Sequence, residues 1–63
     1  MEKGLYKKID EYSLAYAANW VRFPKGIKDL KVSDWENHEG EIKEGWYWFN
    51  SEEAAKEFFQ IKI

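Results

Sequence analysis

The chain has 63 residues, a formal net charge of −2, an aromatic content of 19% and no cysteine. A chain of this length buries only about 60% of its unfolded surface, so we expect one thin core and a single domain over residues 1–63. The missing cysteines exclude a disulfide framework and thiolate metal sites. No apolar run approaches the roughly 18 residues that span a membrane, and the N-terminus lacks an apolar signal stretch. The expected location is the cytoplasm, with no membrane partner.

The charges are distributed unevenly along the chain. Residues 1–32 have seven basic and four acidic residues, a net charge of +3, whereas residues 33–63 have three basic and eight acidic residues, a net charge of −5. Such an asymmetry can give a small protein two oppositely charged faces.

The first elements expected are a short strand and a helix. Leu5 to Ile9 predicts an edge strand, because Lys7 would share a side with apolar residues. Beyond it, aromatic and apolar residues recur at spacings of three and four, as on one face of a helix over residues 10–22. The residues with this spacing are Ile9, Tyr12, Tyr16, Trp20 and Phe23. Three alanines favour helix, and Pro24 would end it. The alternative is a strand from Tyr12 to Phe23.

A turn and a basic segment follow. The composition of 24–26 predicts the turn, and residues 27–32 predict a short extended piece or a loop. Lys25, Lys28 and Lys31 are spaced by three and could line one side of it. A solvated edge is the simpler interpretation, and a phosphate-binding patch is the alternative.

A second helix is predicted over residues 34–44. Ser33 and Glu36 have the spacing of a capping box, in which the serine caps the helix and the glutamate returns to the serine N–H. Gly40 would weaken this helix by roughly 1 kcal/mol, and Gly45 would end it. Its apolar side would consist of Trp35, His38 and Ile42.

Four consecutive aromatic residues, Trp46 to Phe49, predict a strand at the centre of the sheet. A helix over 51–60 follows, with Asn50 as N-cap and Glu53 completing a second capping box. Alternation along the strand sends Tyr47 and Phe49 to the side of that helix. Trp46 and Trp48 then require a different cover, which would be either the helix over 10–22 or a partner.

Groups that could carry catalysis are few. His38 is the one histidine, and helical spacing would put Asp34 one turn away, which suggests a weak site for a divalent ion. A solvated surface pair is the simpler interpretation. The four glycines stand apart and form no phosphate-binding motif. We therefore expect no enzyme, no cofactor and no resident metal.

The predicted fold class is α+β: a short sheet of two or three strands, with strand 46–49 central, packed by two or three helices at about 10–22, 34–44 and 51–60. The runner-up is a three-helix arrangement in which the aromatic segment is a buried extended link. We find no resemblance to a known family.

The expected function is that of a non-enzymatic protein-binding domain, an inhibitor or adaptor of the accessory type found in bacterial viruses, which would bind a host protein. Segment 33–44 has a net charge of −4 and would complement a basic protein surface, such as one that normally holds nucleic acid. The partner-binding residues predicted on these grounds are Trp46, Trp48, Trp35, Asp34, Glu36, Glu39 and Glu41.

Two alternatives remain open at this level. One is a nucleic-acid-binding module that uses the Lys25, Lys28 and Lys31 edge together with Arg22 and Trp20. The other is a homodimeric structural protein, in which surplus aromatic surface closes a symmetric interface.

Overall fold

The computed structural model describes residues 3–23 and 28–62. Within these ranges the chain forms six strands in two antiparallel sheets, a short 3₁₀ helix and one α-helix. The four-stranded sheet has the order β2-β1-β6-β5, and the two-stranded sheet pairs β3 with β4. The bounds are β1 Gly4–Lys8, β2 Leu14–Ala17, β3 Trp20–Val21, β4 Leu30–Lys31, η1 Val32–Trp35, β5 Glu41–Lys43, β6 Trp46–Phe49 and α1 Glu52–Phe59.

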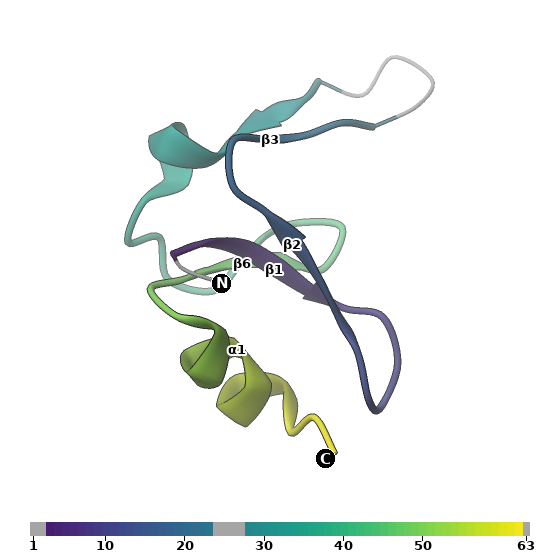
Figure 1. The fold of residues 1–63 in the computed structure, drawn as a ribbon. Helices are drawn as coiled ribbons and strands as arrows, with labels where there is room; N and C mark the ends of the chain where they lie inside the picture. The colour runs from purple at the N-terminus through teal and green to yellow at the C-terminus, as the bar shows by residue number, and fades with distance from the viewer. Residues whose placement is uncertain (1–2, 24–27, 63) are drawn as a thin grey trace.

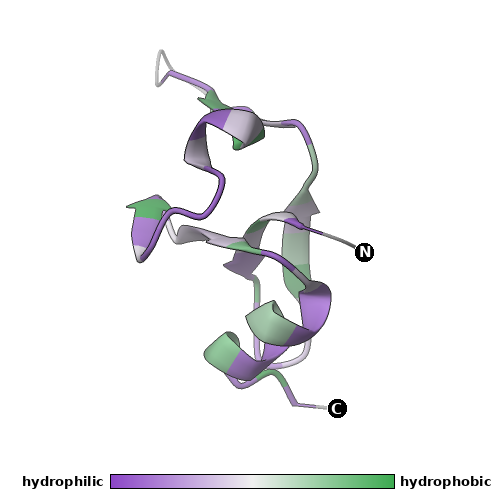
Figure 2. Ribbon diagram, turned by 90° about the vertical axis from the view of Figure 1, so that its left-hand side faces the viewer, coloured by the Kyte–Doolittle hydropathy of each residue, from purple (hydrophilic) through white to green (hydrophobic). Residues whose placement is uncertain are grey.

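The four-stranded sheet lies between two different covers (Figure 1). Helix α1 lies on one side of it, and the β3–β4 ribbon with η1 lies on the other; a view turned by 90° shows the same order (Figure 2). The register explains how β1 serves both covers. Leu5 is opposite Trp48 and Ala17, whereas the next residue, Tyr6, is opposite Tyr47 and Tyr16. Successive residues of a strand point to opposite faces, so each pair belongs to a different side.

The side that carries α1 is an aromatic cluster. Tyr6 is fully buried, and its ring centroid lies 4.9 Å from that of Tyr16 and 5.9 Å from that of Phe49. The ring centroid of Tyr47 lies 4.9 Å from that of Phe58 and 5.4 Å from that of Phe59, and both phenylalanines are on α1. Tilted and edge-on ring pairs at these distances are favourable beyond the area they bury. The cluster therefore fixes α1 against the sheet.

The opposite side is aliphatic at its centre. Leu5, Val21, Leu30 and Val32 form one buried cluster that joins β1 to the ribbon and η1. Burying such a side chain fully stabilises the fold by about 1.5–3 kcal/mol. The partly buried residues packed against this cluster are Ala17, Phe23, Trp35, Ile42, Trp46 and Trp48.

Two turns fix the hairpins of the sheet. Between β1 and β2 the carboxylate of Asp10 accepts hydrogen bonds from the Tyr12 N–H and the Ser13 hydroxyl, both at 2.8 Å. Between β5 and β6 the loop has two residues, Glu44 with φ 54° and Gly45 with φ 85°. Positive φ at both central residues is the requirement of a type I′ turn, whose twist matches that of the flanking strands.

Helix α1 begins one residue later than its sequence pattern predicts. The Ser51 hydroxyl accepts a hydrogen bond from the Ala54 N–H at 3.1 Å, so Ser51 is the N-cap and Asn50 is not. At the other end Gln60 adopts the left-handed conformation, and its N–H donates to the carbonyl of Glu57. Both ends have the polar partners that a short helix requires.

The predicted α+β class with two or three packed helices is wrong, and so is the three-helix arrangement, because the described chain is mostly sheet. Residues 10–22 form a turn, β2 and β3 instead of a helix. Pairing of β2 with β1 over four positions outweighs the helix propensity of the alanines. At 18–19 the chain bends into the second sheet, where the Asn19 carbonyl accepts a hydrogen bond from the Val32 N–H at 2.9 Å.

The predicted helix over 34–44 is also absent. Its beginning is η1, which has no side-chain cap, and its end is β5. Asn37 and Gly40 have positive φ, which interrupts any helix between them. Gly45 belongs to the hairpin turn and does not end a helix.

Of the other predictions, some are confirmed and one is wrong. The aromatic strand β6 lies inside the sheet and Tyr47 and Phe49 face α1, which confirms both predictions. Strand β1 was expected at an edge but is paired on both sides. The predicted turn at 24–26 lies outside the described residues.

Candidate interaction surface

The three tryptophans predicted to bind a partner lie close to one core. Trp35, Trp46 and Trp48 are half-buried and pack against the aliphatic cluster between the sheet and the ribbon. Trp46 and Trp48 are thus partly covered by the second sheet together with η1, which follow β2 in the chain. The predicted cover, a helix over 10–22, does not form.

The predicted acidic residues lie around η1 and the loop that follows it. Asp34, Glu36 and Glu39 are exposed. Glu36 forms an ion pair with Lys3 at 3.4 Å in which both side chains are about half exposed or more, so it contributes little to stability. Glu41 is different, because its carboxylate accepts the Gly45 N–H at 2.7 Å and so supports the β5–β6 turn.

His38 lies next to Trp35 in the segment that follows η1. The backbone N–H of His38 donates to the Trp35 carbonyl at 3.0 Å, and the imidazole ring stands edge-on to the Trp35 indole, with 5.1 Å between centroids and an angle of 90°. The helical spacing that would have placed Asp34 beside His38 does not exist. Within residues 3–23 and 28–62, no group of three or more histidine, cysteine, aspartate and glutamate side chains is arranged to hold a metal ion.

A cleft of about 480 Å³ lies between β4, η1 and β5. Its apolar residues are Leu30, Trp35 and Ile42, and its charged residues are Lys28, Asp29, Lys31, Asp34 and Lys43. A smaller cavity of about 140 Å³ is lined by Trp48, Glu36 and Lys3, with Val32, Ser33 and Ala18. The first two residues of η1, Val32 and Ser33, line the smaller cavity, and the last two, Asp34 and Trp35, line the larger one. We name the larger one the η1 cleft.

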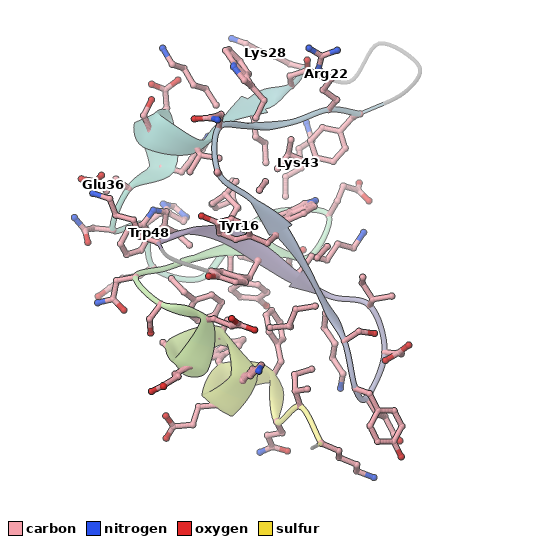
Figure 3. The ribbon with its side chains drawn as sticks, viewed as in Figure 1. Tyr16, Arg22, Lys28, Glu36, Lys43 and Trp48 are labelled. Atoms are coloured by element: carbon pink, nitrogen blue, oxygen red, sulfur yellow. The ribbon has the colours of Figure 1, made fainter. Side chains whose placement is uncertain are left out.

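Sequence reasoning missed the contribution of Lys43 to the η1 cleft. This lysine is distant in sequence from Lys28 and Lys31, and the cleft brings all three together. Figure 3 shows Lys28 and Arg22 at the outer end of the ribbon and Lys43 between the ribbon and the sheet. Lys43 is placed beside the cleft by the pairing of β5 with β6. The sequence could have indicated this position of Lys43 only if residues 41–43 had been predicted as a strand.

Trp20 lies on the other face of the ribbon. Val21 and Leu30 are paired and buried, so their neighbours Trp20 and Lys31, also paired, point outward. Trp20 is 53% exposed, and the Lys31 Nζ lies 5.9 Å from its ring centroid in a cation–π contact. Lys25, predicted to extend this basic edge, lies outside the described residues.

The charged side chains of the described residues lie at the surface of the molecule. No charged side chain among them is buried. Asp10 has a pKa below its ordinary value because the Tyr12 N–H and then the Ser13 hydroxyl donate hydrogen bonds to its ionised carboxylate. That carboxylate is in the β1–β2 turn, away from the η1 cleft, where its role is to hold the turn.

Comparison of the chain with protein-family models, with curated proteins and with solved structures found no match in any of the three. In the part of the chain that the structure describes, no helix is long and apolar enough to cross a membrane.

Proposed function

We propose that the chain is a small non-enzymatic protein-binding domain that acts in the cytoplasm as an inhibitor or adaptor. The observation that carries this proposal is the η1 cleft: an apolar floor containing Trp35, open to solvent, lined also by the exposed carboxylate of Asp34. Glu36 and Glu39, also exposed, follow in the segment after η1. Binding hot spots combine a large aromatic side chain with a pocket that excludes water. The accessory-protein format found in bacterial viruses, with a host protein as partner, is part of the proposal and rests on small size and net acidity alone.

The charges around the cleft suggest how a partner would be oriented. Asp34 lines the cleft from η1, whereas Lys28 and Lys43 line it from the residues before β4 and from β5. Asp29 lines it from the β4 side as well, and the Lys31 ammonium lies over Trp20. A partner segment that places an apolar side chain in the cleft would present basic groups to η1 and an acidic group to the lysines. Complementary charges of this kind steer association and fix register more than they add affinity.

The test compares two kinds of variant in quantitative affinity capture from a bacterial lysate, followed by titration with the purified partner. Trp35→Ala removes the aromatic floor, and reversal of the three acids to lysine inverts the charge of exposed positions without touching the core. We expect each change to weaken binding by about thirtyfold or more, the loss of a hot spot of at least 2 kcal/mol. The controls are Tyr12→Ala, which removes an exposed aromatic side chain near the β1–β2 turn, and Glu53→Lys with Glu57→Lys on α1.

Unfolding curves establish that each variant keeps its fold before binding is compared. If the charge-reversed and Trp35→Ala proteins are folded and bind the partner as the original chain does, the η1 cleft is not the interaction site. If they and the α1 controls lose binding equally, only overall charge matters, and the cleft is again excluded.

A second candidate function is supported by the exposed Trp20. The Trp20 ring lies beside Lys31, and Arg22 and Lys28 lie at the outer end of the same ribbon (Figure 3). An unpaired base can stack on an exposed ring while phosphates contact nearby cations. Three phosphate contacts to a single strand would make the affinity fall about twentyfold between 50 and 200 mM salt. Titration of a fluorescent single-stranded oligonucleotide measures this slope. No binding at low salt eliminates the candidate.

A further inference from the structure

The two outer strands of the four-stranded sheet are protected very differently. β5 carries charged residues at both ends, Glu41 and Lys43, and its pairing with β6 contains a register shift between them. β2 has the sequence Leu-Ala-Tyr-Ala, with no charge, no proline and no irregularity in its four-position pairing with β1. Natural proteins block exposed edges with charges, prolines or bulges, because an open edge is a template for another strand. Only β5 has such protection.

The open side of β2 presents main-chain groups of known residues. The Ile9 N–H donates to the Ser13 carbonyl at 3.0 Å, and this pair continues the β1–β2 register. Hydrogen-bonded pairs alternate along an antiparallel ladder, so Lys7 with Ala15 is also such a pair. The N–H and C=O groups of Leu14 and Tyr16 therefore point away from β1, toward the open edge.

We propose that β2 pairs antiparallel with β2 of a second copy of the chain, about a two-fold axis that passes at Ala15. In this register Leu14 lies opposite Tyr16 of the second copy, Ala15 lies opposite its own equivalent, and Ser13 lies opposite Ala17. The outward-pointing main-chain groups of the two copies then meet each other. Moving the axis by one residue in either direction would carry the pairing into the Asp10–Ser13 turn or into the bend at 18–19.

The exposed apolar side chains near β2 favour pairing with a second copy of the chain over pairing with an unrelated strand. Large hydrophobic side chains are exposed at both ends of β2: Ile9 at 61% and Tyr12 at 67% at one end, and Trp20 at 53% at the other. Antiparallel pairing brings the end that carries Tyr12 beside the end of the second copy that leads to Trp20. Tyr12, which a single copy leaves 67% exposed, then lies beside residue 18 of the second copy at the edge of the interface.

The charges and the faces of β2 also match a second copy. In the proposed register Glu11 falls opposite Asn19, so no like charges meet across the axis. Leu14 and Tyr16 are both on the α1 side of the sheet, and the Tyr16 ring is fixed by its hydroxyl, which donates to the Lys3 carbonyl at 3.0 Å. An aromatic side chain that is already ordered loses little entropy on binding. The pairing would extend the aromatic cluster across the axis.

The test uses the position on the axis. Ala15→Glu places the new carboxylate opposite Lys7 within each copy, a favourable cross-strand pair that preserves the fold. Between copies the same change sets two carboxylates against each other. Sedimentation velocity over a dilution series should show a reversible dimer for the original chain. We expect Ala15→Glu to raise its dissociation constant by about tenfold or more.

Two further measurements make the result specific. Mixing Ala15→Glu with Ala15→Lys should restore association, because opposite charges then meet at the axis; the control Asn50→Glu, a charge added at an exposed site after β6, should leave the dimer unchanged. In a mixture of isotope-labelled and unlabelled original chain, nuclear Overhauser effects should join the Leu14 methyls of one copy to the Tyr16 ring of the other. A chain that is monomeric at every concentration, a dimer that tolerates Ala15→Glu, or the absence of these contacts overturns the proposal.

Discussion

Gly4 is the position at which the packing of β2 on β1 can be tested by a single methyl group. It is buried, and a Cβ atom there would lie 2.6 Å from the Ala17 carbonyl oxygen and 2.8 Å from Cε1 of Tyr16. The carbonyl belongs to the ladder that pairs Leu5 with Ala17, so it cannot withdraw without opening the hairpin. The Tyr16 ring can swing away, but it then loses its hydrogen bond to the Lys3 carbonyl and its contact with Tyr6.

These losses set the expected size of the effect of Gly4→Ala. Overpacking costs about 1–3 kcal/mol, the hydrogen bond contributes about 1 kcal/mol, and the ring pair contributes about 0.5–1.5 kcal/mol. The Tyr16 ring either stays and is strained, or moves and loses its contacts, so the three costs do not add in full. We therefore expect the free energy of unfolding to fall by about 2–4 kcal/mol. For a domain of this size the midpoint of thermal unfolding would fall by roughly 10–25 °C.

Urea and thermal unfolding, followed by far-ultraviolet circular dichroism, measure the effect. The comparison variant is Gly40→Ala, where a Cβ would meet no atom within 4 Å but the backbone has φ of 83°. Only the conformational strain of about 1–2 kcal/mol applies there. If Gly4→Ala destabilises the chain no more than Gly40→Ala does, β2 does not approach β1 as closely as described.

Three further changes test other parts of the fold. Ser51→Ala should lower the free energy of unfolding by about 1 kcal/mol, whereas Asn50→Ala should change it by less than about 0.5 kcal/mol; equal effects in urea titrations would contradict the assignment of the cap. The pKa of Asp10 is lowered in the folded chain, so its carboxylate stabilises the β1–β2 turn above the ordinary value of 3.8, and this stability is lost as the pH falls through the lower folded value. The amide resonance of Tyr12 should shift as Asp10 titrates, with a midpoint below pH 3.8. Asp10→Asn should abolish this pH-dependent shift. A midpoint at or above the ordinary value would refute the hydrogen bonds to the Asp10 carboxylate. Leu5→Ala should cost about 2–5 kcal/mol, since this side chain is fully buried, and a loss below about 1 kcal/mol would place Leu5 outside the core.

The parts of the fold that sequence predicted correctly depend on contacts between near neighbours. Alternation along β6 assigned Tyr47 and Phe49 to the α1 side and Trp46 and Trp48 to the other. Helix α1 was predicted over 51–60 from the capping box of Asn50 and Glu53. Its start was misplaced by one residue, because Asn50 and Ser51 are both good N-caps and only the three-dimensional structure selects between them.

The failure over residues 10–22 has a non-local cause. Aromatic residues there have helical spacing, but they belong to different environments: Tyr12 is exposed near the turn, Tyr16 packs on Tyr6, and Trp20 is exposed on the ribbon. What makes the segment a strand is its pairing with β1, which in turn depends on β6 from the far end of the chain. The local pattern allowed both a helix and the alternative of a strand from Tyr12 to Phe23, and only the distant pairing selects the strand.

The error over residues 34–44 was more avoidable. Glu41-Ile42-Lys43 alternates charged and apolar residues just before Glu44-Gly45 and the aromatic strand, which is the pattern of a hairpin with a two-residue turn. Glutamate is not among the residues usually found at the first turn position, and the glycine was interpreted as a helix stop. That misassignment also concealed the η1 cleft, because β5 supplies one of its walls.

Whether residues 14–17 are a strand on β1 decides both the sheet and the edge proposed for self-pairing. Nuclear Overhauser effects between Hα protons of the isotope-labelled chain measure this most directly. Tyr6 with Tyr16 and Lys8 with Leu14 alternate with the hydrogen-bonded pairs, so their Hα protons should be close and give strong cross-strand signals. Absence of these signals, together with continuous amide–amide contacts from 12 to 22 as in a helix, would contradict the two-sided sheet.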